Sequence, residues 1–185
     1  MPQAMRADAV RNRDRLMTAA AELFAERGVD VPLDEVARRA GVSIGTLYNH
    51  FPNRGALLDA VLPGRFAEFD TLAGAALADP DPWHGFTTFL DGIFVMQARD
   101  RAINEAIARS PVGNVDVSAE CGRAGGVLDA VAQHARDAGV LRPDFGPADL
   151  ATLVWAMSKV ISMSEGDDAV WRRHLAFVLD GLRAT

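Results

Sequence analysis

Apolar residues recur at helical spacing along most of the chain, and the first clear series lies between residues 11 and 27. Positions i, i+3, i+4, i+7 and i+8 of this series are Leu16, Ala19, Ala20, Leu23 and Phe24. Glu22 and Glu26 fall on the opposite side, so the pattern predicts an amphipathic helix that ends at Gly28. Residues 1–10 are expected to form a disordered arm.

Two shorter apolar series follow in residues 33–54, and a glycine separates them. The first series is Leu33, Val36, Ala37 and Ala40, and the second is Val42, Leu47 and Phe51. Gly41 is expected to take a positive φ at the end of the first helix, and the Ser43 hydroxyl is expected to cap the second. This arrangement predicts a helix-turn-helix, which completes a three-helix unit with the helix of residues 11–27.

The second of these helices turns an unusual set of side chains toward water. They are short or planar groups, most with hydrogen-bonding capacity, at Ile44, Gly45, Thr46, Tyr48, Asn49 and His50. Glu and Lys, which are common on solvated helices, are absent from this face. Long acidic side chains would meet phosphate in the DNA major groove, so the composition favours a recognition helix.

The rest of the chain also predicts helices, with no strand pattern. One helix begins near Asn53 and continues in phase across Pro63-Gly64, where a kink is expected. The segment Asp79 to Pro82 is expected to interrupt the helical structure before an aromatic-rich helix. A short helix is expected over about 101–109. Residues 112–126, with four glycines, are expected to be a loop or a frayed helix start. Three more helices are expected after them: one that ends at Gly139, one over 147–164 and one over 168–183.

The last two helices carry apolar residues on two faces, so they need two partners: their own core and a second chain. We therefore expect a homodimer with a four-helix interface. The residues assigned to it are Ala151, Trp155, Ser158, Ser162, Val170, Trp171, His174 and Phe177.

Composition restricts the class of protein further. The chain has 185 residues, 49% of them hydrophobic, without an apolar run of membrane-spanning length or a signal-peptide pattern, so a soluble cytoplasmic protein is expected. Its single cysteine excludes an internal disulfide. The net charge of −6 opposes bulk binding to nucleic acid, but residues 1–60 are neutral and the acidic excess is entirely C-terminal.

The run AGVSIGTLYNHF, with Arg54, Leu57, Leu58 and Val61 after it, resembles the TetR family of bacterial transcriptional regulators. The resemblance is specific over about residues 10–62; beyond them only length, helix number and layout agree. It implies an all-α protein with a helix-turn-helix DNA-binding domain at 1–52 and a helical ligand-binding and dimerisation domain at 53–185. The function it implies is a repressor released from a palindromic operator by a small-molecule effector.

The resemblance also implies roles for single residues. The residues that match family positions mostly in contact with phosphates are Ser43, Thr46, Tyr48, His50 and Arg54. The residues that match the variable positions in contact with base edges are Ile44, Gly45 and Asn49. Pro32 departs from the family, which often has Ser or Thr there as a cap. Arg11 and Arg13 either reach DNA from the first helix or are simply solvated.

A ligand cavity in the C-terminal domain is the expected effector site. The candidate lining is mostly apolar: Trp83, Phe86, Phe89, Phe94, Asn104, Cys121, Met157 and Phe177. Each of these residues, taken alone, fits an ordinary helical core as well. Their number and the scarcity of nearby charges favour an apolar or aromatic effector that is neutral or cationic.

No catalytic, metal or cofactor site is expected. His84, His134 and His174 lie on different predicted helices without metal-ligand spacing. Cys121 is either a redox sensor or a small apolar residue. The alternative functions are an all-helical dimer that binds a small molecule without a role in transcription, and a helical enzyme.

Overall fold

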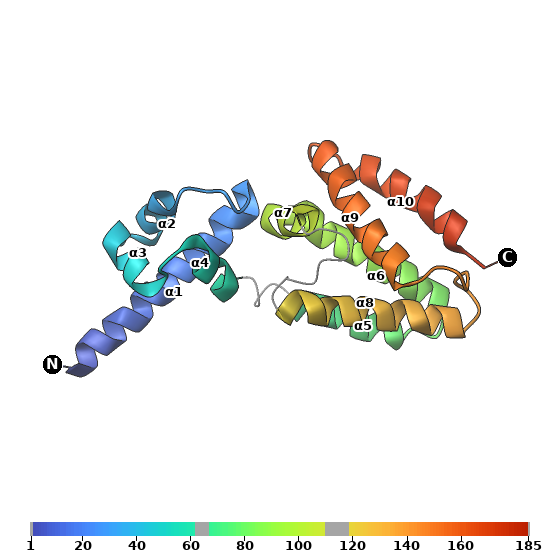
Figure 1. The fold of residues 1–185 in the computed structure, drawn as a ribbon, viewed down its shortest axis with the longest axis horizontal. Helices are drawn as coiled ribbons and strands as arrows, with labels where there is room; N and C mark the ends of the chain where they lie inside the picture. The colour runs from blue at the N-terminus through green and yellow to red at the C-terminus, as the bar shows by residue number, and fades with distance from the viewer. Residues whose placement is uncertain (1, 62–66, 110–118, 185) are drawn as a thin grey trace. The chain divides into compact units, whose positions relative to one another are not determined.

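The computed structural model describes residues 2–61, 67–109 and 119–184, and these ranges form helices joined by short connections (Figure 1). The all-α class predicted from the sequence is confirmed. The helices are α1 (Pro2–Arg27), α2 (Leu33–Ala40), α3 (Ile44–His50), α4 (Arg54–Val61), α5 (Ala67–Leu77), α6 (Pro82–Arg99), α7 (Arg101–Arg109), α8 (Ala119–Asp137), α9 (Pro147–Met163) and α10 (Asp168–Leu182).

The chain divides into two compact units. The first contains residues 1–64 with 100–102, and the second contains residues 65–99 and 103–185. The first unit therefore extends past the expected boundary at residue 52. The reason is α4, whose Leu57 and Val61 are buried in the hydrophobic core of the first unit.

The core of the first unit is built from the predicted apolar series. Leu16, Ala20 and Phe24 of α1 are fully buried, as are Val36 of α2 and Leu47 of α3. The prediction for residues 1–10 was wrong, because α1 begins at Pro2. Good helix formers from residue 3 onward explain the extension, and proline is tolerated in a first helical turn.

The second unit is organised around α6, against which α5, α8, α9 and α10 all pack. Its core stripe contains Phe86, Phe89, Leu90, Ile93 and Phe94, all buried. After α8 the chain pairs with the end of α10, where Leu141 and Arg183 form an isolated β-bridge. This bridge fixes the C-terminal end of α10 to the rest of the unit.

Two glycines let α5 and α6 approach closely. A Cβ atom on Gly85 would lie 2.5 Å from the carbonyl oxygen of Ala76, and one on Gly92 would lie 2.8 Å from a methyl group of Leu72. Real side chains do not approach backbone oxygen so closely. Gly85 therefore limits the spacing of the helix pair, whereas the Leu72 methyl group opposite Gly92 belongs to a side chain that can turn away.

Several predicted helix ends are confirmed. α6 begins at Pro82, the last residue of the predicted break. α9 begins at Pro147, and the Asp149 carboxylate accepts a hydrogen bond of 2.9 Å from the Gly146 amide. Residues 112–126 were expected to be a loop or a frayed helix start, and the second alternative fits residues 119–126, because α8 begins at Ala119. The helix tolerates its glycines because Val131, Ala132 and Ala135 further along are buried. The predicted kink at Pro63-Gly64 lies outside the described residues.

Candidate functional site

The turn between α2 and α3 has the predicted geometry. Gly41 has φ 66° and ψ 37°, the left-handed conformation that favours glycine. The amide of Val42 donates to the Ala37 carbonyl at 3.0 Å, which closes the end of α2. The atom closest to a Cβ at Gly41 is the guanidinium end of the exposed Arg15, which can move aside. The backbone conformation is therefore what requires glycine here.

Ser43 caps α3 as predicted. Its Oγ accepts a hydrogen bond from the Thr46 amide at 3.1 Å and lies 2.9 Å from the Thr46 hydroxyl. Leu47 and Phe51, buried to 0% and 2% exposure, anchor the opposite side of the helix in the core. The cap and these anchors fix both the start and the rotation of α3.

The candidate DNA-contacting residues of α3 share its outward side. The exposed ones are Ser43, Ile44, Gly45, Tyr48 and Asn49, and Thr46 and His50 are half-buried. Ile44 and Tyr48 keep 41% and 49% of their surface exposed, which is unusual for large apolar side chains. They also line an open hollow of about 450 Å³, together with Asp34 and Asn53. The structure therefore gathers these residues on one surface.

Arg54 has a partner that the sequence did not indicate. Its Nη1 donates to the carbonyl of Val29 and, at 2.7 Å, to the carbonyl of Val31. Both carbonyls belong to the connection between α1 and α2, and the contact is part-buried. Arg54 therefore fastens the start of α4 to this connection, which makes it a positioning residue whatever it contacts on DNA.

Arg11 and Arg13 also have partners within the first unit. Arg11 pairs with Asp8, one turn earlier on α1. The Arg13 guanidinium lies 4.9 Å from the ring centre of Phe51, the residue that ends α3. Arg13 is thus held beside the recognition helix, whereas Arg11 makes a local exposed pair.

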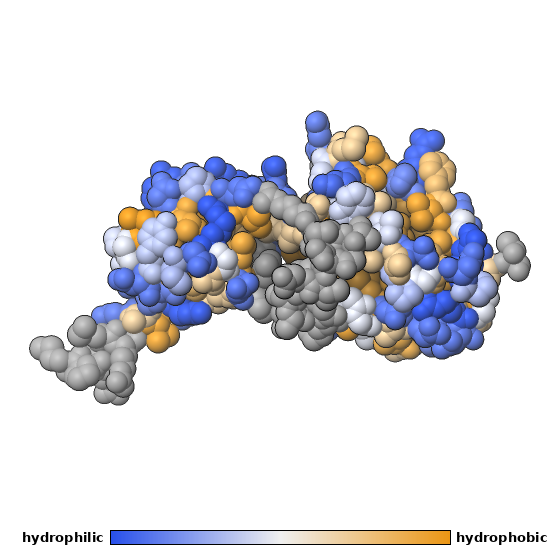
Figure 2. All heavy atoms as spheres, viewed as in Figure 1, coloured by the Kyte–Doolittle hydropathy of each residue, from blue (hydrophilic) through white to orange (hydrophobic). Residues whose placement is uncertain are grey.

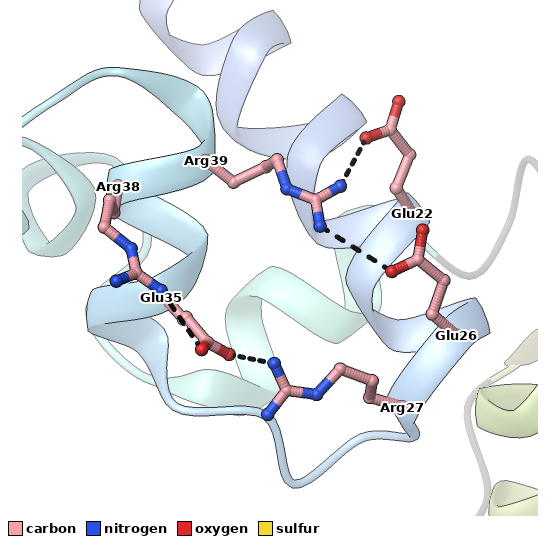
Figure 3. A network of polar contacts seen from close by, with 6 residues as sticks. All are labelled: Glu22, Glu26, Arg27, Glu35, Arg38 and Arg39. Atoms are coloured by element: carbon pink, nitrogen blue, oxygen red, sulfur yellow. Dashed lines mark hydrogen bonds and ion pairs between the residues drawn. The ribbon is translucent and has the colours of Figure 1, made fainter.

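Surface ion pairs join α1 to α2 on another side of the unit (Figure 3). Arg39 of α2 lies 3.2 Å from Glu22 and 3.6 Å from Glu26 of α1. Glu35 lies between two guanidinium groups, 2.5 Å from Arg27 and 3.1 Å from Arg38. All six residues are shown in Figure 3, and their arrangement ties the first helix of the helix-turn-helix to α1.

The candidate effector residues mostly lie in the core of the second unit. Phe86, Phe89, Phe94 and Met157 are buried and Trp83 is half-buried. Phe177 is 62% exposed and lies outside this core. The side chain of Cys121 lies outside the described residues.

Two buried amides stand out in this core. Gln97 is 1% exposed and Asn104 is 5% exposed. Neither polar atom of the Gln97 amide has a hydrogen-bond partner, and the Oδ1 of Asn104 also has none. Sequence analysis missed Gln97, although it continues the spacing of Phe86, Leu90 and Ile93 on α6.

The residues assigned to a dimer interface divide into two groups. Ala151, Ser162, Val170, His174 and Phe177 are exposed and Trp155 is half-buried. Ser158 and Trp171 are 0% and 1% exposed within their own chain, so they have almost no surface left for a second chain. Trp171 packs edge-on against Phe94 and its indole donates to Asp168 at 3.0 Å. Figure 2 shows hydrophobic residues on the surface over α9 and α10.

The described residues contain no group of three or more His, Cys, Asp or Glu side chains placed to hold a metal ion. None of the described helices is long and apolar enough to cross a membrane. His84 Nδ1 lies 2.7 Å from the Asp79 carboxylate, and this hydrogen bond raises the pKa of His84. His84 is exposed and Asp79 is half-buried, and the pair lies at the start of α6, where it supports the turn before the helix.

Comparison with known proteins identifies the family. The profile of the bacterial regulatory proteins of the tetR family matches residues 16–61, and that of the C-terminal domain of SbtR-like transcriptional regulators matches residues 81–184. The second match alone covers more than half of the chain. The chain therefore belongs to the TetR family of transcriptional regulators, as the sequence resemblance indicated.

Individual relatives agree with this assignment. The chain is 34% identical over 106 residues to the HTH-type transcriptional regulator TtgR of Pseudomonas putida. The matched region covers 54% of this chain and 50% of TtgR. It spans half or less of the length of the first curated relatives that it matches.

Solved structures match over nearly the whole chain. A TetR transcription regulatory protein from Mycobacterium vanbaalenii is 31% identical with a TM-score of 0.58, covering 97% of this chain and 99% of that one. The structure of RolR in complex with resorcinol is 25% identical with a TM-score of 0.58, covering 97% and 91%.

Proposed function

We propose that this protein is a cytoplasmic, homodimeric repressor that binds a palindromic operator in double-stranded DNA and is released by a small-molecule effector. The first unit would contact DNA, and the second would bind the effector and dimerise. The observation that carries the proposal is the capped, rigidly anchored α3, which exposes Ile44, Tyr48 and Asn49 on one surface. Effector binding would favour a spacing of the two α3 helices that no longer matches the operator.

On this proposal α3 divides its contacts between phosphates and bases. Hydroxyls such as those of Ser43, Thr46 and Tyr48 suit phosphate oxygens, and the Asn49 amide can pair with the edge of an adenine. Exposed Ile44 can contact the methyl group of a thymine. His50 is half-buried, so its role is confined to the end of the helix.

The proposed dimer uses the exposed apolar residues of α10. Val170 and Phe177 are 51% and 62% exposed, which leaves an apolar surface that a second copy would cover. The half-buried Trp155 of α9 would complete the interface. A two-fold dimer would present two α3 helices to the two halves of a palindrome.

The proposed effector is an apolar or aromatic compound, neutral or cationic. Phe86, Phe89, Phe94 and Met157 give the core of the second unit an aromatic and thioether character. The buried polar residues among the described ones, Gln97, Asn104, Ser158 and Ser164, carry no charge. The complex of the similar regulator RolR with the neutral phenol resorcinol supports this choice.

The proposal is tested by gel shift on DNA upstream of the protein's own coding sequence. Wild type is expected to bind one fragment specifically. Asn49→Ala should cost roughly 1 to 3 kcal/mol on that fragment and much less on a scrambled duplex. Thr18→Ala, an exposed change on α1, is the matched control and should bind like wild type. Absence of specific binding by wild type would favour a helical ligand-binding protein without a role in transcription.

Arg54→Ala provides a second comparison in the same assay. Because Arg54 holds the carbonyls of Val29 and Val31, its loss should lower the melting temperature of the protein as well as DNA affinity. The loss of affinity should be similar for operator and scrambled DNA. An unchanged melting temperature with a reduced salt dependence of binding would instead identify a phosphate contact alone.

A further inference from the structure

Gln97 places a complete amide in an apolar environment without any hydrogen bond. It occupies the buried stripe of α6, four residues after Ile93 and three after Phe94, and is 1% exposed. Its Nε2 and Oε1 both lack a partner. A buried polar group without a partner has lost its water and gained nothing in exchange, so Gln97 destabilises the ligand-free protein.

Asn104 is held so that its acceptor oxygen remains free. Its Nδ2 donates to the carbonyl of Ser158 at 3.1 Å and to the hydroxyl of Ser162 at 2.9 Å, both on α9. Turning the amide over would place Oδ1 against the Ser158 carbonyl, where two acceptors would repel each other. The unpartnered Oδ1 is therefore a fixed feature of the site.

We propose that Gln97 and Asn104 are the polar anchors of the effector site, and that the effector is a neutral, largely apolar molecule with at least one hydroxyl or amide group. This inference rests on the proposed effector binding and adds the chemistry of recognition. Gln97 offers a free acceptor, Oε1, and a free donor group, Nε2, and Asn104 offers a free acceptor, Oδ1. A hydroxyl group both donates and accepts, so it can pair with either amide.

The core of the second unit favours a neutral ligand over a charged one. Its buried side chains are mostly aromatic and aliphatic, including Phe94 and Met157. Among the described residues no acidic or basic side chain is buried there. A charged ligand would lose its hydration without gaining a counter-ion, whereas a neutral ligand would lose little.

The first experiment measures the melting temperature of the ligand-free protein. Gln97→Leu replaces the unpartnered amide by an apolar group of similar size and should raise the melting temperature by about 2 to 4 °C. Gln97→Met, with an unbranched side chain, should act in the same direction if Leu packs poorly. Ala130→Leu, on the exposed side of α8, places the same side chain in water and is the control; it should leave the melting temperature nearly unchanged. A decrease with both Gln97 variants would show a purely structural role and overturn the proposal.

The second experiment measures recognition with matched pairs of small probes. Resorcinol is compared with m-xylene, and phenol with toluene, by the shift in melting temperature across a concentration series. Wild type should bind the hydroxyl member of at least one pair about tenfold or more tightly than its methyl counterpart. Gln97→Leu and Asn104→Leu should lose this preference. Equal binding of both members of each pair, or no binding of any probe, would overturn the proposal.

The two proposals fail in different ways. If wild type shows the hydroxyl preference but binds no operator fragment in the gel shift, the anchors stand and the role in transcription fails. If wild type binds its operator but shows no preference, the role in transcription stands and the anchors fail. Water buried at the two amides would give the second result, since water satisfies the amides without selecting a ligand.

Discussion

The two units of this protein place their polar groups in opposite ways. In the first unit the buried side chains among the described residues are hydrophobic, and the polar groups lie outside, on α3 and in the ion pairs of Figure 3. The second unit buries four polar residues, among them Gln97 and Asn104. Both units expose large apolar residues, such as Ile44 and Tyr48 in the first and Val170 and Phe177 in the second, so the clear difference lies in what they bury.

This difference follows from the partners that we propose. DNA presents the same phosphates and a small set of base edges to every regulator, so a rigid unit with contacts on its outer surface is sufficient. A small ligand must be enclosed, so the groups that recognise it must be buried before it arrives, at a cost in stability. A second copy of the chain binds to the outer surface, so dimerisation requires exposed apolar residues.

The largest expected effect comes from the exposed apolar face of α10. Phe177→Asp should give a monomer and reduce operator affinity by about 100-fold or more, because the two half-sites would no longer be bound together. Sedimentation velocity and operator titration measure the two effects. Phe177→Leu keeps the face apolar and should remain dimeric. A stable Phe177→Asp dimer at micromolar concentration would mean that this face is not the interface.

Trp171→Asp tests whether a buried residue of α10 responds differently from the exposed Phe177 of the same helix. Trp171 is 1% exposed, so a carboxylate there would be buried and the second unit should unfold rather than simply dissociate. Circular dichroism distinguishes the two results. A folded Trp171→Asp monomer would contradict the core assignment of this residue.

A smaller effect is expected at the close contact of α5 and α6. Gly85→Ala would push a methyl group toward the Ala76 carbonyl and should destabilise the second unit by roughly 1 to 3 kcal/mol. Gly74→Ala, on α5 with open space around it, is the matched control and should stabilise by roughly 0.5 to 1 kcal/mol. Urea unfolding gives both values. Changes of the same sign in both variants would show that packing does not fix the helix spacing.

The smallest effect is expected from the ion pairs of the first unit. Arg39→Ala removes the pairs with Glu22 and Glu26, which are exposed, so it should cost only roughly 0.2 to 1 kcal/mol. The loss should disappear at about 1 M salt, where screening is strong. A larger loss that persists in high salt would show that the first unit depends on these charges as much as on its core.

Much of the DNA-binding site could be predicted because its signals are local. The positive φ of Gly41 and the cap from Ser43 to Thr46 each involve residues a few positions apart, and glycine and serine favour these conformations intrinsically. Arg54 was missed as a positioning residue because its partners lie 23 and 25 residues earlier. No local pattern indicates which carbonyls a long side chain will reach.

The proposed effector site depends more on distant contacts. Asn104 was a candidate for the lining of the ligand cavity and is buried, but its hydrogen bonds to α9 join residues 54 and 58 positions apart. Gln97 was overlooked because a polar residue near the end of an apolar stripe usually marks the point where a helix leaves the core.

The sequence by itself determined the helices and their ends in most places, the helix-turn-helix and the family. Helical periodicity shows which residues share a face, and caps and glycines show where a face ends. Periodicity does not show whether a helix face packs against its own core, against another chain or against solvent. Only the tertiary structure decided that Trp171 of α10 is buried against Phe94 while Phe177 of the same helix remains outside. That choice depends on how all the helices of the unit fill space together, and distant contacts decide it.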